Sequence, residues 1–167
     1  DMLLEAAALT TQISGQVIPS NVPGNMAMAV RQPAGVVLGI APWNAPVILG
    51  VRAISTPLAC GNTVILKGSE ISPATHGLII EALQEAGLPE GVVNFVTNAP
   101  ADAGTVVEAM VAHPALRRVN FTGSTKVGRL IAQTCAKYLK PVVLELGGKA
   151  PFVVLDDADI DAAVQGA

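Results

Sequence analysis

The sequence predicts an α/β fold: an open, mostly parallel sheet with helices on both faces, joined to a proline-rich hairpin arm. Two observations lead to this prediction. Between residues 36 and 146, short apolar runs alternate without exception with segments suited to helices, which implies right-handed crossovers between parallel strands. Apolar residues also make up 51% of the chain and charged residues only 14%. That balance is typical of strands buried on both faces of a sheet.

The first 34 residues are expected to form a unit separate from residues 35–167. Residues 2–11 have the pattern of a short amphipathic helix, and residues 26–32 are expected to be extended. Residues 14–25 between them are rich in turn formers and contain two prolines. Because proline cannot donate to a central ladder, such a hairpin is expected to be an edge element or an arm.

The second unit is expected to follow a regular order. Its strands are the apolar runs at residues 36–40, 63–67, 92–96, 118–122 and 142–146, with a further strand at 152–155. Its helices are expected at residues 45–58, 73–87, 101–112 and 124–138, with a short last helix from Asp159. Asn44 and Ser124 are suitable N-caps, and Gly87 is a suitable helix stop.

Composition excludes several classes of function. The net charge is −3, aromatic residues make up 3%, and no basic cluster occurs, so a nucleic-acid partner is not expected. No apolar run is long enough to cross a bilayer, so a membrane partner is not expected either. The two cysteines, Cys60 and Cys135, have neither metal-ligand spacing nor a CxxC pattern. We therefore expect a cytoplasmic, reduced protein without a metal site.

Polar or glycine-rich residues follow each of the first five strands of this unit. In open α/β sheets, ligands bind at the carboxyl ends of the strands. The segments that should meet at this edge are residues 41–44, 67–70, 97–100, 123–128 and 145–148. The sequence therefore predicts one binding site built from five strand ends.

Two of these segments contain candidate catalytic groups. Glu145 ends an apolar strand, where ionisation is costly, which suits a general base near neutral pH. The alternative is an ion pair between Glu145 and Lys149. Asn44 follows the chain's only tryptophan, Trp43, at a strand-to-helix turn, and its amide could donate to a developing oxyanion. The alternative is an N-cap asparagine beside a packing tryptophan.

Two further segments suit a dinucleotide. Residues 123–125 at a helix start could seat a phosphate, although Ser124 could also be a plain N-cap. Lys67 and Glu70 could hydrogen-bond ribose hydroxyls, with Glu70 repelling a 2′-phosphate and thus favouring NAD over NADP. The alternative is a solvated surface pair. The G-x-G-x-x-G fingerprint of ordinary Rossmann folds is absent.

Five motifs in the chain resemble, in order and spacing, those of the NAD(P)-dependent aldehyde dehydrogenase superfamily. They lie at residues 41–46 (APWNAP), 66–70 (LKGSE), 87–92 (GLPEGV), 121–124 (FTGS) and 144–149 (LELGGK). Together with residues 96–104 (VTNAPADAG), they look most like the aromatic-aldehyde branch, such as salicylaldehyde or vanillin dehydrogenases. Gly68 stands where many members have proline, and Asn98 and Pro100 replace common glycines.

The resemblance implies a Rossmann-like NAD-binding domain that acts on a small-molecule aldehyde. It implies that Asn44 is the oxyanion donor and Glu145 the base that activates water. The cofactor contacts that it implies are Ile40, Pro42, Trp43, Lys67, Ser69, Glu70, Gly104, Phe121, Thr122, Gly123, Ser124, Val127, Leu146 and Gly147. The hairpin at residues 16–31 would belong to an arm used in homo-oligomerisation, together with exposed apolar surface.

The resemblance also implies a cysteine nucleophile, which in the family lies in the following domain. Neither Cys60, expected to be buried at a helix end, nor Cys135, expected inside a helix, matches it. We therefore expect a truncated chain that lacks the catalytic domain. One hypothesis is that Glu145 deprotonates an aldehyde hydrate, which gives its hydride directly to NAD while Asn44 holds the oxygen. The other hypothesis is a non-catalytic module that binds NAD or self-associates.

Overall fold

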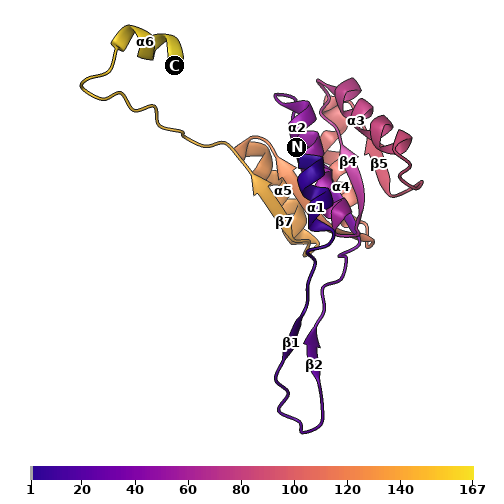
Figure 1. The fold of residues 1–167 in the computed structure, drawn as a ribbon. Coiled ribbons are helices and arrows are strands. Elements are labelled where there is room, and N and C mark those ends of the chain that lie inside the picture. Colours follow the sequence, from indigo (N-terminus) through magenta and orange to yellow (C-terminus); the bar gives the residue numbers. More distant parts are fainter. Residues whose placement is uncertain (1) are drawn as a thin grey trace.

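The computed structural model describes residues 2–167 and contains two separate sheets (Figure 1). The elements in chain order are α1 (Met2–Leu9), β1 (Gln16–Ile18), β2 (Ala27–Ala29), β3 (Val36–Ile40), α2 (Pro46–Ala59), β4 (Thr63–Lys67), α3 (Pro73–Glu85), β5 (Val93–Val96), the 3₁₀ turn η1 (Pro100–Asp102), α4 (Ala103–Ala112), β6 (Leu116–Thr122), α5 (Thr125–Lys137), β7 (Val142–Glu145) and α6 (Ile160–Gly166). The larger sheet has the order β5-β4-β3-β6-β7, and all its strand pairs are parallel. The predicted fold class is confirmed.

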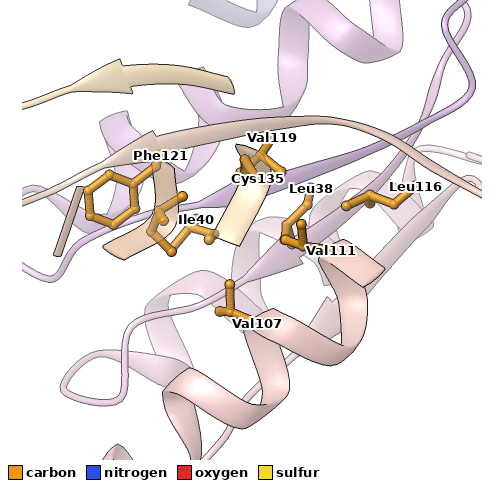
Figure 2. Close-up of a cluster of buried hydrophobic side chains, with 9 residues drawn as sticks. Leu38, Ile40, Val107, Val111, Leu116, Val119, Phe121 and Cys135 are labelled. Carbon is orange, nitrogen blue, oxygen red and sulfur yellow. The ribbon is translucent and has the colours of Figure 1, made fainter. Parts of the chain in front are cut away.

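The larger sheet is covered by helices on both faces, because alternate residues of each strand point to opposite sides. On one face, Val37 of β3 packs in a cluster with Ala53 and Ile54 of α2. On the other, Leu38 packs with Val107 and Val111 of α4 (Figure 2). The central strands β3 and β4 therefore contribute to both cores, which helps to explain the high apolar content of the chain.

The hairpin arm extends away from the larger sheet (Figure 1). Its strands β1 and β2 pair in antiparallel fashion, with Gln16 opposite Ala29 and Ile18 opposite Ala27. Both faces of the arm are open: Val17 is 72% exposed on one face, and the next residue, Ile18, is 46% exposed on the other. The predicted arm is confirmed as a hairpin, and its use in assembly stays a prediction.

The structure corrects two expectations about the elements. The strand expected at residues 152–155 is wrong: this segment is exposed and unpaired, and the chain beyond β7 runs away from the sheet (Figure 1). Gly147, Gly148 and Pro151 precede it, and none of them favours continuing a ladder. Asn44 is not the N-cap of α2, because the cap position falls at Ala45 without a side-chain hydrogen bond.

The remaining elements lie where they were expected, apart from small shifts at their ends. Helix α3 stops at Glu85, and Gly87 follows in the left-handed conformation with φ of 89°, as a helix stop requires. Among residues 2–167, no helix has the length and apolar character needed to cross a membrane.

Candidate functional site

The carboxyl ends of the five parallel strands meet at one edge of the sheet, as the sequence predicted. Ile40 at the end of β3 is in register with Lys67 of β4 on one side and with Phe121 of β6 on the other. Thr122 is in register with Glu145 at the end of β7. The segments that follow these strands therefore start side by side.

Backbone hydrogen bonds continue the pairing past the strand ends. The Gly68 amide donates to the Val96 carbonyl at 3.0 Å, and the Gly123 amide donates to the Glu145 carbonyl at 3.0 Å. Backbone hydrogen bonds therefore fix the positions of the segments that follow the strands, without a contribution from a ligand.

The strand order reverses between β3 and β6. The chain winds outward from β3 to β4 and β5 and then returns to β6 on the other side of β3. Ligands of open α/β sheets bind at such a switch point, outside the carboxyl ends. The residues that flank it are Asn44 after β3 and residues 122–124 after β6.

A polar network lies at the ends of β4 and β5, and it involves Lys67, Glu70 and Asn98. The Lys67 ammonium donates to Glu70 Oε1, and Asn98 Nδ2 donates to the same oxygen at 3.0 Å. The side chain of Lys67 is 6% exposed and that of Glu70 is 23% exposed. The alternative of a solvated surface pair is therefore wrong.

The charge state of Glu70 follows from its partners. Partial burial alone would raise its pKa, but hydrogen bonds from Lys67 and Asn98, together with the charge of Lys67, hold the pKa of Glu70 below its ordinary value. Glu70 is therefore ionised at neutral pH. Asn98 Oδ1 is buried without a hydrogen-bond partner among residues 2–167. An ionised carboxylate with further polar atoms around it suits a pair of ribose hydroxyls.

The segment after β3 is open to ligands. Trp43 is 57% exposed and Asn44 is exposed, while Pro42 is half-buried between Ala41 and Trp43. Because α2 is capped at Ala45, the amide of Asn44 is not used to start the helix. The alternative for Trp43 and Asn44, a packing tryptophan beside a capping asparagine, is therefore wrong.

The start of α5 follows β6. Ser124 is the N-cap of this helix, and its Oγ accepts from the Val127 amide at 3.3 Å. Thr122 and Gly123 are half-buried, and Val127 is 42% exposed at the first turn. The cap uses the hydroxyl of Ser124 while the helix dipole still favours an anion at this end. Both interpretations of this serine are therefore compatible with the structure.

Glu145 lies at the expected edge but is exposed, which corrects the expectation of a buried carboxylate. Strand β7 is an edge strand, and its Leu144 points to the α4–α5 core while Glu145 points away from it. The alternative ion pair is also wrong: within residues 2–167, the acidic partners of lysines are Glu70 and Glu108, not Glu145. Two strand spacings, about 10 Å, separate β3 from β7, which leaves room for a small molecule between the two segments.

Leu146 and Gly147 follow Glu145 along the start of α5. A Cβ on Gly128 would lie 2.5 Å from Leu146 Cδ2, so Leu146 packs directly against this bare position of the helix. Gly147 lies beside Thr125, whose Oγ1 would be 4.0 Å from an added Cβ. These two residues therefore lie along the first turns of α5.

Three predicted cofactor contacts lie apart from the open edge. The side chains of Ile40 and Phe121 are 7% and 4% exposed, and both belong to the α4–α5 core (Figure 2). A ligand can therefore reach these two residues only at the backbone. Gly104 is exposed in the first turn of α4, and a Cβ there would meet nothing within 4 Å.

The cysteines differ from each other. Cys135 is fully buried, and burial raises the pKa of its thiol, so it is an inert core residue as expected. Cys60 is half-buried rather than buried, because it lies at the C-cap of α2 beside an open groove. Neither lies in the segments that follow the strand ends. Within residues 2–167, no three His, Cys, Asp or Glu side chains gather into a metal-binding group.

Sequence reasoning missed two residues of this region. The sequence places Asn98 in the segment at residues 97–100, at the binding edge, but assigns it no role of its own. His76 is fully buried at the start of α3, and its Nδ1 accepts from the Ser69 amide at 3.1 Å. The signal for His76 was its spacing of four residues from Ile80, which puts both on the core face of α3.

Comparison with known proteins identifies the family. The model of the aldehyde dehydrogenase family matches residues 1–167. The chain belongs to the aldehyde dehydrogenase family. This aldehyde dehydrogenase chain is 72% identical over 166 residues to the vanillin dehydrogenase of Pseudomonas sp. (strain HR199 / DSM 7063), covering 99% of this chain and 34% of that protein. The chain spans about a third of the length of the relatives it matches.

Solved structures give the same result for the fold. A salicylaldehyde dehydrogenase from Pseudomonas putida G7, crystallised with salicylaldehyde, superposes with a TM-score of 0.90 at 53% identity, over 96% of this chain and 33% of that one. PnpE in complex with nicotinamide adenine dinucleotide superposes with a TM-score of 0.85 at 40% identity, over 97% of this chain and 32% of that one. The aldehyde dehydrogenase chain therefore has the fold of this portion of both enzymes.

Proposed function

We propose that this chain contributes the NAD site, the oxyanion donor and the general base of an NAD-dependent dehydrogenase that oxidises an aromatic aldehyde to the acid. The observation that carries this proposal is the partly buried Lys67–Glu70–Asn98 network at the carboxyl edge of the sheet. The identity of 72% with a vanillin dehydrogenase supports the aromatic substrate. In this proposal residues 35–167 form the dinucleotide-binding domain, and residues 1–34 form an arm for homo-oligomerisation.

The residues present fit NAD. The ionised Glu70, 23% exposed beside Lys67, suits the hydroxyls of the adenosine ribose, and a 2′-phosphate would be repelled by Glu70. Ser69 shares this loop, and Gly104 lies in α4, the helix that follows β5 and its polar end. The start of α5, with Thr122, Gly123, Ser124 and Val127, suits the pyrophosphate. When bound, the nicotinamide accepts a hydride from the substrate.

The remaining roles concern the reacting atoms. Backbone groups of Ile40 and Phe121, with Pro42 and Trp43, would border the cofactor beside the switch point. Leu146 and Gly147 would border the nicotinamide along α5. The exposed amide of Asn44 would hold the aldehyde oxygen, and Glu145, open to solvent at the opposite side of the edge, would take a proton from water. Exposure lets a water molecule reach Glu145 directly. We place the reaction in the cytoplasm, where free cysteines such as Cys60 and Cys135 persist.

Calorimetry with NAD and with NADP tests the nucleotide site. We expect NAD to bind more tightly than NADP, and the Glu70→Gln variant to lose most of that preference. Glu108→Gln is the matched control, because Glu108 also pairs with a lysine but lies on the exposed surface of α4. Equal affinity of the wild type for both nucleotides would contradict the assigned role of Glu70.

Formation of NADH with vanillin and salicylaldehyde tests the reaction. We expect Glu145→Gln and Asn44→Ala each to lower turnover by about 100-fold, in line with loss of a general base or of one oxyanion donor. NADH formation that is unchanged in Glu145→Gln would eliminate this base. NAD binding without any turnover would favour the second candidate, a non-catalytic NAD-binding module.

Exposed apolar surface is the observation that favours an assembling role in either case. The two faces of the arm and Val143 on β7, which is 57% exposed, present apolar surface to solvent. Sedimentation should give an oligomer whose population grows with concentration. A monomer at all concentrations would contradict assembly through the arm.

A further inference from the structure

We propose that His76 is a positioning residue for NAD, which holds the ribose-binding loop at residues 67–70 in shape by accepting a hydrogen bond from the Ser69 amide. This inference rests on the proposed NAD site. His76 bonds to the backbone of Ser69 and makes no hydrogen bond to Lys67, Glu70 or Asn98, so it would act through the loop.

The molecule provides a fitted space for the imidazole ring. His76 is completely buried, and two glycines border it. A Cβ on Gly50 of α2 would lie 2.9 Å from His76 Cδ2, and a Cβ on Gly68 would lie 3.2 Å from His76 Nδ1. Any side chain at either position would collide with the ring or with its neighbours. The ring therefore fills the gap between α3, the second turn of α2 and the loop itself.

The hydrogen bond fixes both the loop and the protonation state of the ring. The Ser69 amide donates to His76 Nδ1 at 3.1 Å, so Nδ1 is an acceptor and the proton of the neutral ring is on Nε2. Ser69 is 5% exposed, so its amide has no access to water as a substitute. Losing the acceptor would leave a buried donor unpaired, which favours a different loop conformation.

The loop's other contacts lie on either side of this bond. The Gly68 amide donates to the Val96 carbonyl at 3.0 Å, and the Ile71 amide donates to Ser69 Oγ at 3.1 Å. Glu70, the proposed ribose ligand, lies between Ser69 and Ile71 in the chain. The His76 bond is thus the contact that ties the middle of the loop to a helix rather than to the sheet or to itself.

The ring is held neutral by its surroundings. Burial lowers the pKa of His76; the nearby Pro46 carbonyl offsets part of this, and the charge of Lys67 adds to it. The Pro46 carbonyl is not placed for a full hydrogen bond, because Nε2 has no partner among residues 2–167. Of the groups near the ring, Lys67 from β4 acts on it through its charge, which Glu70 balances. Gly50 from α2 is uncharged, as is Phe95 from β5, which borders the neighbouring Gly68.

Protonation of the ring would remove the acceptor. A proton on Nδ1 would face the Ser69 amide, so two donors would meet where one bond existed. The affinity for NAD should therefore have its full value above the ordinary titration range of histidine. It should fall as the pH drops below that range.

Three variants separate the acceptor from the packing of the ring. Asn at position 76 places its Oδ1 where Nδ1 lies and keeps the acceptor. Gln places its amide one bond further out, where Nε2 lies, and Leu fills the space without any acceptor. By calorimetry we expect His76→Leu and His76→Gln to weaken NAD binding about tenfold, and His76→Asn to restore most of it.

Ligand fragments and kinetics give readouts that a merely structural role would not change. AMP contains the adenosine ribose and should follow NAD across the variants, whereas nicotinamide mononucleotide lacks it and should bind all of them equally. In turnover, KM for NAD should rise in His76→Leu with little change in KM for the aldehyde. The NAD affinity of His76→Asn should be flat over the pH range in which that of the wild type declines.

The outcomes distinguish this inference from the proposed function. If the wild type binds neither NAD nor AMP, the nucleotide site itself is wrong. If the wild type binds NAD and His76→Leu binds it equally well, only the role of His76 is wrong. If all three variants lose AMP and nicotinamide mononucleotide binding alike, with a loss of helical circular dichroism, His76 is a core residue without a positioning role.

Discussion

Replacing Glu70 by Gln tests the polar network with the least change in shape. In the wild type, Asn98 Nδ2 lies 3.0 Å from Glu70 Oε1. The variant keeps an oxygen that can accept this hydrogen bond, but it removes the negative charge beside Lys67. Lys67 remains on β4 with its side chain 6% exposed. A buried cation without its partner is the main consequence of this single substitution.

The expected loss of stability follows from burial. A hydrogen bond to a charged group contributes about 1.5–3 kcal/mol. The Glu70 side chain keeps 23% of its surface exposed, so water screens part of the interaction. We therefore expect Glu70→Gln to lower the free energy of unfolding by about 1–2 kcal/mol.

Urea unfolding monitored by circular dichroism measures this loss, with the slope of the transition as a check that both variants unfold alike. Glu108→Gln removes a carboxylate from the other lysine pair, whose side chains are 61% and 49% exposed, and it should have no measurable effect. A loss in Glu70→Gln no larger than in Glu108→Gln would refute the argument that burial gives the Lys67–Glu70 pair its strength.

Three other predictions concern stability. Burial raises the pKa of Glu70, but the hydrogen bonds from Lys67 and Asn98, together with the charge of Lys67, outweigh it and hold this pKa below its ordinary 4.5. The contribution of Glu70 to stability is therefore present above pH 4.5 and is lost as the pH falls through the lowered pKa. Unfolding in acid should thus show the wild type and Glu70→Gln converging in stability. Leu38→Ala, at a fully buried position between β3 and α4 (Figure 2), should lower the free energy of unfolding by about 2–5 kcal/mol in urea. Ser124→Ala removes the N-cap of α5 and should lower it by about 1 kcal/mol, whereas Ser124→Asn should not.

The sequence predicted the central strands β3 and β4 most closely, because these two strands are buried on both faces. Runs such as residues 63–67 have no polar interruption, and the structure begins and ends β4 at the same two residues. Burial of this kind leaves the strand little freedom in its bounds.

The apolar pattern predicted a strand wrongly in a segment whose apolar residues are not buried. Residues 152–155 are as apolar as the other strands, yet they are exposed and unpaired. An apolar run is a strand only when an adjacent strand offers its edge, and pattern alone does not reveal whether one does. The same limit explains Glu145, which a buried strand end would have desolvated but an edge strand leaves in solvent.

The site was predicted at the level of segments better than at the level of side chains. All five segments lie at one edge because parallel crossovers return every strand in the same direction. Partners across the edge were not predictable: Asn98 and Glu70 are 28 residues apart and meet only because β5 and β4 are neighbours. The bond from Ser69 to His76 likewise depends on how α3 packs back onto the sheet.

Consecutive side chains in a strand motif cannot all contact a ligand, because they point alternately to opposite faces. In the motif at residues 121–124, Phe121 fills the α4–α5 core while Thr122 and Ser124 reach the edge. Ile40 and Ala41 divide in the same way between the two cores at the end of β3. A motif at a binding edge therefore also contains residues that pack in the core and hold that edge in place. Resemblance at the level of motifs assigns roles to both kinds of residue, and the direction of each side chain separates them.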